Sequence, residues 1–252
     1  MIEVRNVTKR YGATTVVDDV SLDVPGGGLV ALIGPNGAGK STLLSMMSRL
    51  LTPDAGQVPV AGLDVRTTPS DVLARRLAIL RQDAHVGSRL TVRDLVTFGR
   101  YPYSKGRYTV EDRAHVERAL DFLDLQPYAH RFLDELSGGQ RQRAFVAMVL
   151  CQDTAHVLLD EPLNNLDMRH AVAMMRLLRR ATDELGTTTV VVLHDINVAS
   201  CWADRIVAMK DGRVAYDGPP EEVVRTEVLS DVYDLDVAVH ELDGQRIGTY
   251  YR

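Results

Sequence analysis

The chain has 252 residues, of which 45% are hydrophobic, and a formal net charge of −5. This length suffices for one domain with a sizeable core, and an acidic chain without basic runs is not expected to bind nucleic acid, whose phosphates attract clusters of Lys and Arg. Two cysteines are too few for a disulfide framework, and we expect Cys151 and Cys201 to be buried thiols in a reducing compartment.

The sequence contains neither a signal-peptide pattern nor a stretch long enough to cross a membrane. Met1 to Arg5 is not the charged and then apolar start of a signal peptide, and nowhere do ~18 apolar residues follow one another. We therefore expect any association with a membrane to go through a partner protein.

The first part of the chain has the patterns of strands. Alternating apolar residues over 2–7 and 20–24 predict two strands, and the apolar run 29–33 is typical of a strand buried on both faces. This third strand leads into a glycine loop and a predicted helix over about 40–50. A strand, a loop and a helix in this order are the context that a phosphate-binding loop requires.

The chain then changes from strands to helices. Ser70 is the predicted N-cap of a helix that ends near Ala78, and 77–80 is a predicted strand. Strand patterns are absent over 84–144, where two pairs of residues have the spacing of capping boxes that open helices. We interpret 84–144 as an inserted helical subdomain. The two pairs are Thr91 with Asp94 and Thr109 with Asp112.

Three alternations of strand and helix follow and imply a largely parallel sheet covered by helices, which is an α/β fold. A helix is expected between the N-cap Asp167 and the stop signal Gly186, and a second one ends near Ala203. Asp211-Gly212 is a hairpin turn, and 236–252 is a predicted short C-terminal hairpin. The predicted strands are 157–159, 188–193 and 206–209.

A phosphate-loop pattern, G-x-x-x-x-G-K-[ST], starts at Gly34. Glycines let backbone N–H groups turn toward phosphate oxygens, and the helix that follows adds the positive end of its dipole. Lys40 would neutralise the β- and γ-phosphates of ATP, and the Ser41 hydroxyl would bind Mg²⁺. The candidate nucleotide-binding residues are Gly34, Pro35, Asn36, Gly37, Ala38, Gly39, Lys40, Ser41 and Thr42.

The predicted strand over 157–159 ends in two carboxylates, Asp160 and Glu161. Asp160 would hold Mg²⁺, and Glu161 would orient or deprotonate the attacking water. A strand that ends in acids is common, so this motif takes its weight from the phosphate loop upstream.

A pentapeptide, Leu136-Ser137-Gly138-Gly139-Gln140, opens a predicted helix ahead of the acidic strand. With the phosphate loop before it and the acidic strand after it, the sequence resembles the ATP-binding cassette (ABC) proteins. The resemblance implies a single nucleotide-binding domain over 1–252 with the P-loop NTPase fold, which is a RecA-like core with a mixed sheet, an amino-terminal antiparallel part and the helical insertion. It also implies that the helix start binds the γ-phosphate of an ATP held by a second subunit, through Ser137, Gly138, Gly139 and Gln140.

Other positions match the family one at a time. The resemblance implies that Tyr11 stacks on adenine, that Gln82 touches Mg²⁺ and the attacking water, and that His194 reaches the γ-phosphate. Asn165 stands in the segment known as the D-loop, where the family has a small residue, and this is a departure. Asp167 in the same segment also serves as the helix N-cap.

The phosphate loop and the pentapeptide cannot complete one site within a single copy, according to this resemblance. We therefore expect a head-to-tail homodimer that sandwiches two ATP molecules, with a two-fold axis that makes both contacts at once. ATP would close the dimer and hydrolysis would open it.

Several segments resemble the ATPase subunits of bacterial ferric-siderophore importers of the petrobactin and enterobactin type. This likeness implies permease subunits in the membrane, an indirect link to a siderophore-binding protein, and a place on the cytoplasmic face of the membrane. An importer for haem or cobalamin and a multi-chain exporter stay open as alternatives. We expect the permease to dock on 82–103, which mixes aromatic residues with Arg. The segments are 90–96, 98–103, 160–168 and 193–200.

Overall fold

The computed structural model describes residues 1–82 and 87–251. A six-stranded sheet with the order β11-β10-β3-β9-β8-β7 forms its centre, and all neighbouring strands are parallel except the pair β10 and β11. The predicted α/β fold with a mixed sheet is confirmed. The strands are β3 (Gly28–Ile33), β7 (Leu77–Leu80), β8 (His156–Leu159), β9 (Thr188–Val192), β10 (Arg205–Lys210) and β11 (Arg213–Gly218).

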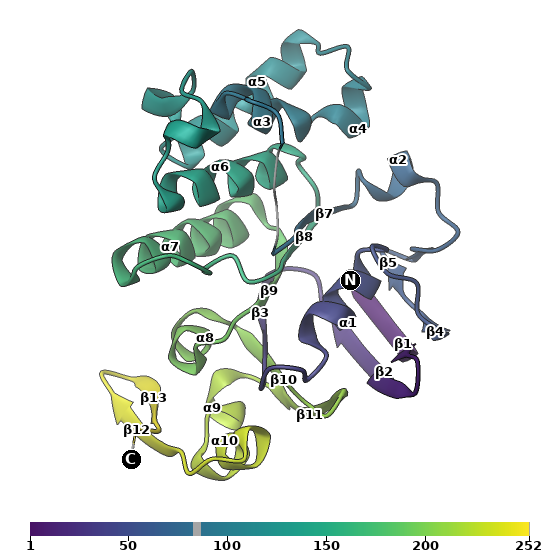
Figure 1. Cartoon of the computed structure of the whole chain (residues 1–252), viewed down its shortest axis with the longest axis vertical. Coiled ribbons are helices and arrows are strands. Elements are labelled where there is room, and N and C mark those ends of the chain that lie inside the picture. Colours follow the sequence, from purple (N-terminus) through teal and green to yellow (C-terminus); the bar gives the residue numbers. More distant parts are fainter. Residues whose placement is uncertain (83–86, 252) are drawn as a thin grey trace.

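A second, antiparallel sheet built mainly from the amino-terminal strands lies beside the first (Figure 1). Its two long strands pair from Ile2 opposite Val24 to Tyr11 opposite Thr14, with register shifts between Val4 and Arg10. The predicted amino-terminal antiparallel part is confirmed. The strands are β1 (Ile2–Tyr11), β2 (Thr14–Val24), β4 (Ala55–Gln57), β5 (Pro59–Val60) and β6 (Leu63–Asp64).

Alternate residues of β3 enter two separate cores, because successive side chains of a strand point to opposite faces. Val30 and Leu32 pack with α1 (Lys40–Met47) and the antiparallel sheet. Leu29 and Ala31 pack on the other face with the helices of the second half of the chain. Burial on both faces explains why β3 is apolar from Leu29 to Ile33. The helices on that other face include α7 (Met168–Leu185) and α8 (Ile196–Trp202).

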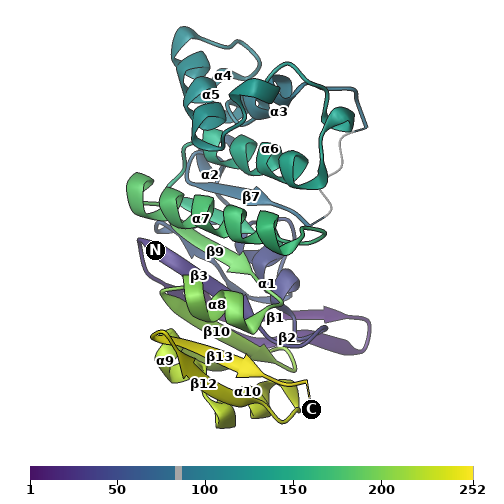
Figure 2. The ribbon, with the colours of Figure 1, turned by 90° about the vertical axis from the view of Figure 1, so that its left-hand side faces the viewer.

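Helices occupy the region from which strand patterns are absent, and they gather at one end of the molecule (Figures 1 and 2). The Thr91 and Thr109 side chains each make a reciprocal capping box, as predicted. The predicted boundary at residue 84 lies outside the described residues, so the extent of the subdomain stays a prediction. The helices are α3 (Val92–Phe98), α4 (Tyr101–Ser104), α5 (Val110–Phe122), α6 (Gly138–Cys151) and the 3₁₀ turns η1 (Gln126–Tyr128) and η2 (Leu133–Glu135).

The carboxyl-terminal elements lie at the opposite end (Figure 2). The hairpin β12–β13 turns at Asp243-Gly244 and is held by two side chains of α8. Asn197 forms two hydrogen bonds with the Gly248 backbone, at 2.8 and 3.2 Å. Ser200 donates one to the Arg246 carbonyl. The elements are α9 (Pro220–Val223), α10 (Thr226–Tyr233), β12 (Ala238–Leu242) and β13 (Gln245–Thr249).

Three predictions about local structure are wrong. Helix α1 ends at Met47 instead of continuing to about 50, because Arg49 takes a left-handed φ of 62°. Helix α2 (Ser70–Leu73) is a single turn whose N-cap is Pro69. The chain turns over 74–76 and enters β7 at Leu77 instead of remaining helical to Ala78. Cys201 is exposed, since the buried Ser200 beside it occupies the inward face of α8.

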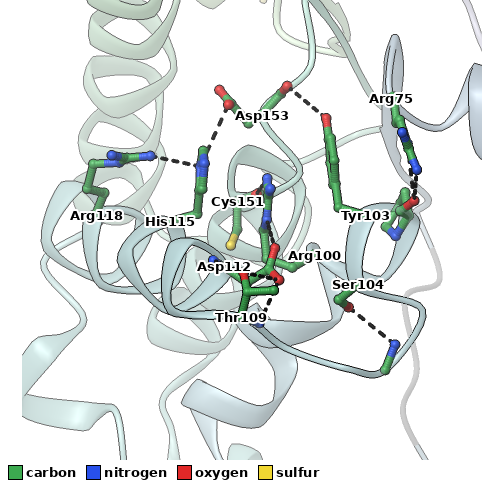
Figure 3. A network of polar contacts seen from close by, with 12 residues as sticks. Arg75, Arg100, Tyr103, Ser104, Thr109, Asp112, His115, Arg118, Cys151 and Asp153 are labelled. Carbon is green, nitrogen blue, oxygen red and sulfur yellow. Dashed lines mark hydrogen bonds and ion pairs between the residues drawn. The ribbon is translucent and has the colours of Figure 1, made fainter.

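A buried ion pair holds the helical region together, as Figure 3 shows. The Arg100 guanidinium contacts the Asp112 carboxylate at 3.0 Å, donates to the Cys151 carbonyl at 3.2 Å and lies 4.0 Å from the Tyr103 ring. Burial raises the pKa of Asp112, but hydrogen bonds from Thr109 and Arg100 outweigh it, and the net pKa is below its usual value. The stability that this carboxylate contributes is therefore present above the unfolded-state pKa and is lost as pH falls below it.

We expect Asp112→Asn to lower the free energy of unfolding by about 3–5 kcal/mol, because it leaves the Arg100 charge buried without its partner. The measurement is urea denaturation at neutral pH. Glu111→Gln, which removes an exposed charge from the same helical turn, is the matched control and should change stability little. A loss below about 1 kcal/mol in Asp112→Asn would show that the pair is dispensable.

Candidate functional site

The phosphate loop lies between the end of β3 and the start of α1, as the sequence predicts. Two of its glycines have no room for a side chain. A Cβ on Gly34, whose φ is 137°, would lie 2.1 Å from the Met209 carbonyl oxygen, and one on Gly39, at φ 95°, would lie 2.6 Å from that of Val16. Backbone from two strands thus fixes the shape of the loop from outside.

The start of α1 presents a positive surface. Gly39 is its N-cap, and among the described residues no side-chain hydrogen bond caps this helix start, so the N–H groups of the first turn are available to an anion. The Lys40 ammonium donates to the carbonyls of Gly34 and Pro35, each at 2.8 Å. Burial lowers the pKa of Lys40, whereas Glu161 and Asp160 act in the opposite sense. The loop, the helix and Lys40 together can bind a chain of phosphates.

Two predicted magnesium ligands are in contact. The Ser41 hydroxyl donates to Asp160 at 2.8 Å, and burial raises the pKa of the Asp160 carboxyl. A hydroxyl and a carboxylate are hard oxygen donors, which fit Mg²⁺. The third predicted ligand, Gln82, is turned elsewhere, since its amide nitrogen donates to Glu161 at 2.7 Å. Ser41 and Asp160 are therefore the two side chains placed to bind a cation here.

Three side chains converge on the Glu161 carboxylate. Gln82 and Asn164 both donate to Oε2, and His194 Nε2 lies 2.7 Å from Oε1. The Glu161 side chain is only 9% exposed, and its backbone takes a φ of 49°, a region that residues other than glycine enter rarely. A carboxylate fixed in this way next to a phosphate loop can orient a water molecule and accept its proton.

The pentapeptide residues are not part of this cluster. Ser137 is the N-cap of α6 and forms a capping box with Gln140, at 3.0 and 3.3 Å. A Cβ on Gly139 would lie 2.6 Å from the His170 ring, so this helix start packs against α7. Within the described residues, no hydrogen bond or ion pair links 137–140 with 34–42, and Figures 1 and 2 place α6 and α1 in different parts of the molecule.

Tyr11, the predicted adenine contact, ends β1 with 53% of its surface exposed. The Lys9 ammonium lies 5.7 Å from the centre of its ring. The ring is thus accessible for stacking, but no neighbouring side chain defines a base pocket around it among the contacts of the described residues.

The surface expected to contact a permease needs correction. Leu95 is 1% exposed and Arg100 is 4% exposed, because Leu95 belongs to the core and Arg100 to the buried ion pair. Phe98 and Tyr101 remain on the surface, at 47% and 59% exposed. Residues 83–86 of the expected docking stretch lie outside the described residues.

Sequence reasoning missed three contacts of the site. Asn164 was placed in the D-loop without a role, although it stands three residues after Glu161, a spacing that a tight turn can bring together. His170 contacts Asp167 and packs on Gly139. Tyr233 touches the phosphate loop from 199 residues away, and no local pattern could indicate this.

Comparisons with known proteins agree with this geometry. Residues 17–164 match the family model described as ABC transporter. The chain is 51% identical to the petrobactin import ATP-binding protein YclP of Bacillus subtilis (strain 168), over 100% of both chains. It is 41% identical to the ferric enterobactin transport ATP-binding protein FepC of Escherichia coli (strain K12), over 91% of this chain and 85% of that one.

A solved structure has the same fold. It is a dimeric post-hydrolysis state of the ATP-binding cassette MJ0796, bound to ADP and Pi, with a TM-score of 0.77 at 30% identity over 87% of this chain and 99% of that one. Within residues 1–82 and 87–251, no helix is both long and apolar enough to span a bilayer. The chain therefore belongs to the ABC transporter family and is an ATP-binding cassette that hydrolyses ATP.

Proposed function

We propose that the chain is the ATPase subunit of an importer that moves a ferric siderophore across a membrane, and that two copies act together on two ATP molecules. The observation that supports hydrolysis most strongly is the convergence of Gln82, His194 and Asn164 on Glu161. The functions of the relatives, which include petrobactin import by a protein 51% identical over the full length, support a siderophore as the cargo.

Each side chain in the cluster has a role in this proposal. Glu161 accepts a proton from the attacking water, and His194 stabilises charge that develops on the γ-phosphate. Lys40 leaves the loop carbonyls to bind the β- and γ-phosphates. Mg²⁺, when bound, would be held by Ser41 and Asp160 and would neutralise phosphate charge. Gln82, whose amide nitrogen donates to Glu161, would help to hold this carboxylate toward the attacking water.

The homodimer explains why the pentapeptide lies away from the loop. The N–H groups at the start of α6 suit an anion, yet within residues 1–82 and 87–251 no hydrogen bond or ion pair joins 137–140 to the loop of the same copy. A second copy that turns its loop toward Ser137 and Gly138 would complete both sites by a two-fold operation. The dimeric state of the related cassette MJ0796 supports this arrangement.

The permease would place the cassette at the cytoplasmic face of the membrane. The exposed Phe98 and Tyr101, together with the 64% exposed side chain of Arg89, offer the aromatic and arginine contacts common at interfaces. The siderophore itself is then bound by other subunits and never touches this chain.

We expect Glu161→Gln to bind ATP as the wild-type protein does but to release phosphate at least about 100-fold more slowly. The reason is that the amide cannot accept the proton of the attacking water. Phosphate release and fluorescent-ATP titration measure the two properties. Glu184→Gln, an exposed carboxylate of α7, is the control that should keep the normal rate. An undiminished rate in Glu161→Gln would remove this residue from the role of base.

The dimer can be tested in the same background. With Mg·ATP, Glu161→Gln is expected to elute as a dimer in light-scattering chromatography, and with ADP as a monomer, since the γ-phosphate bridges the copies. Adding Ser137→Arg should abolish the ATP-dependent dimer while the fold, checked by circular dichroism, persists. Equal dimer formation in the double variant would contradict a sandwich closed by Ser137.

The cargo is testable by growth. Deletion of the gene should impair growth when one ferric siderophore, petrobactin first among them, is the sole iron source, and the intact gene should restore it. The Glu161→Gln gene should fail to restore it. Normal growth of the deletion strain on a whole siderophore panel would overturn siderophore import and leave a haem or cobalamin importer or a multi-chain exporter to be assayed.

A further inference from the structure

The peptide at Gly34 is held from three sides. Its N–H donates to the Tyr233 hydroxyl at 3.1 Å, and its carbonyl accepts from the Lys40 ammonium at 2.8 Å. The Met209 carbonyl lies where a Cβ of residue 34 would be. Gly34 is the first residue of the phosphate loop. Its N–H and its carbonyl therefore both have hydrogen-bond partners, and there is no free space beside its Cα.

Tyr233 reaches this loop from the last residue of α10. Burial raises the pKa of its phenol to about 12, so the hydroxyl keeps its proton throughout the physiological range and accepts from Gly34 as a neutral group. A neutral acceptor satisfies the buried N–H without placing a negative charge near the phosphates. The same hydroxyl is the only side-chain partner of the Gly34 N–H among the contacts of the described residues.

The end of α10 is itself fastened to the central sheet. The Lys210 ammonium of β10 donates to the Asp231 carbonyl and to the Asp234 carboxylate, the latter at 2.8 Å. Tyr216 of β11 donates to the Asp231 carboxylate at 3.1 Å. Since β10 pairs with β3 up to Ala208 and Ile33, the strand that carries the loop and the helix that carries Tyr233 share one support.

We propose that Tyr233 is a positioning residue for nucleotide binding: it fixes the first peptide of the phosphate loop, so that the loop is ordered before ATP arrives. The loss of its hydroxyl would leave the Gly34 N–H unpaired and let this peptide rotate. ATP would then have to order the loop, which weakens binding, whereas the groups around Glu161 keep their geometry.

The test compares Tyr233→Phe with Tyr216→Phe in the purified chain. Each variant removes one phenolic hydroxyl that contacts the same end of the fold, but only Tyr233 touches the loop. We expect KM for ATP, and Kd from fluorescent-ATP titration, to rise about threefold to tenfold in Tyr233→Phe, which is what one neutral hydrogen bond contributes. The kcat should stay within about twofold. Tyr216→Phe should leave KM unchanged, because both Lys210 contacts still hold the end of α10 and the Tyr233 hydroxyl still contacts Gly34.

A purely structural role predicts something else. Both variants would then melt at lower temperature with KM unaltered, or both would change KM equally, and either result would overturn the proposal. If Tyr233→Phe fails to fold, Lys210→Met loosens the end of α10 from outside the loop and should raise KM in the same sense. An unchanged KM in that variant would also count against the positioning role.

Discussion

The parallel pairing of β3, β9, β8 and β7 is the constraint on which the site depends. Parallel strands end at the same edge of a sheet, and here their registers align Leu32 with Val192, Val191 with Leu159, and Leu159 with Leu80. The segments that leave these four strands carry the phosphate loop, the His194 turn, the two carboxylates and Gln82. Ser41 and Asp160, which are 119 positions apart in the sequence, thus come into hydrogen-bonding contact. Ligands in open α/β sheets bind at this edge for the same reason.

At that edge of the sheet, Glu161 is the residue on which the other side chains of the site converge. Its side chain is shielded from solvent, its backbone lies in the left-handed region, and donors from three different segments contact its two oxygens. Positive-φ geometry outside glycine costs free energy and is retained where surrounding structure imposes it. The helix start at Ser137, in contrast, has its own capping box and packs on α7, so it is ready for an anion but separated from the loop. This division is what makes a second copy necessary in the proposed mechanism.

Local sequence patterns predicted the helices and strands that have clear periodicity or capping residues. They failed where contacts between distant parts of the chain determine the structure. The buried strands and the caps at Thr91, Thr109 and Asp167 follow from periodicity and side-chain hydrogen bonding within a few residues. Helix α2 was predicted too long: the chain turns over 74–76, and from Leu77 onward it pairs with β8. Arg100 was expected on the docking surface because aromatic and arginine residues are common at interfaces, and its partner Asp112 was predicted only as a capping residue. Tyr233 carries no signal at all, since its role exists only after α10 folds onto β10.

The most direct test of the account is a structure of the Glu161→Gln chain with Mg·ATP, determined by crystallography or electron microscopy. We expect two copies related by a two-fold axis, with each γ-phosphate contacted by Lys40 and Ser41 of one copy and by Ser137 of the other. A nucleotide site completed within one copy, with residues 137–140 left in solvent, would contradict it.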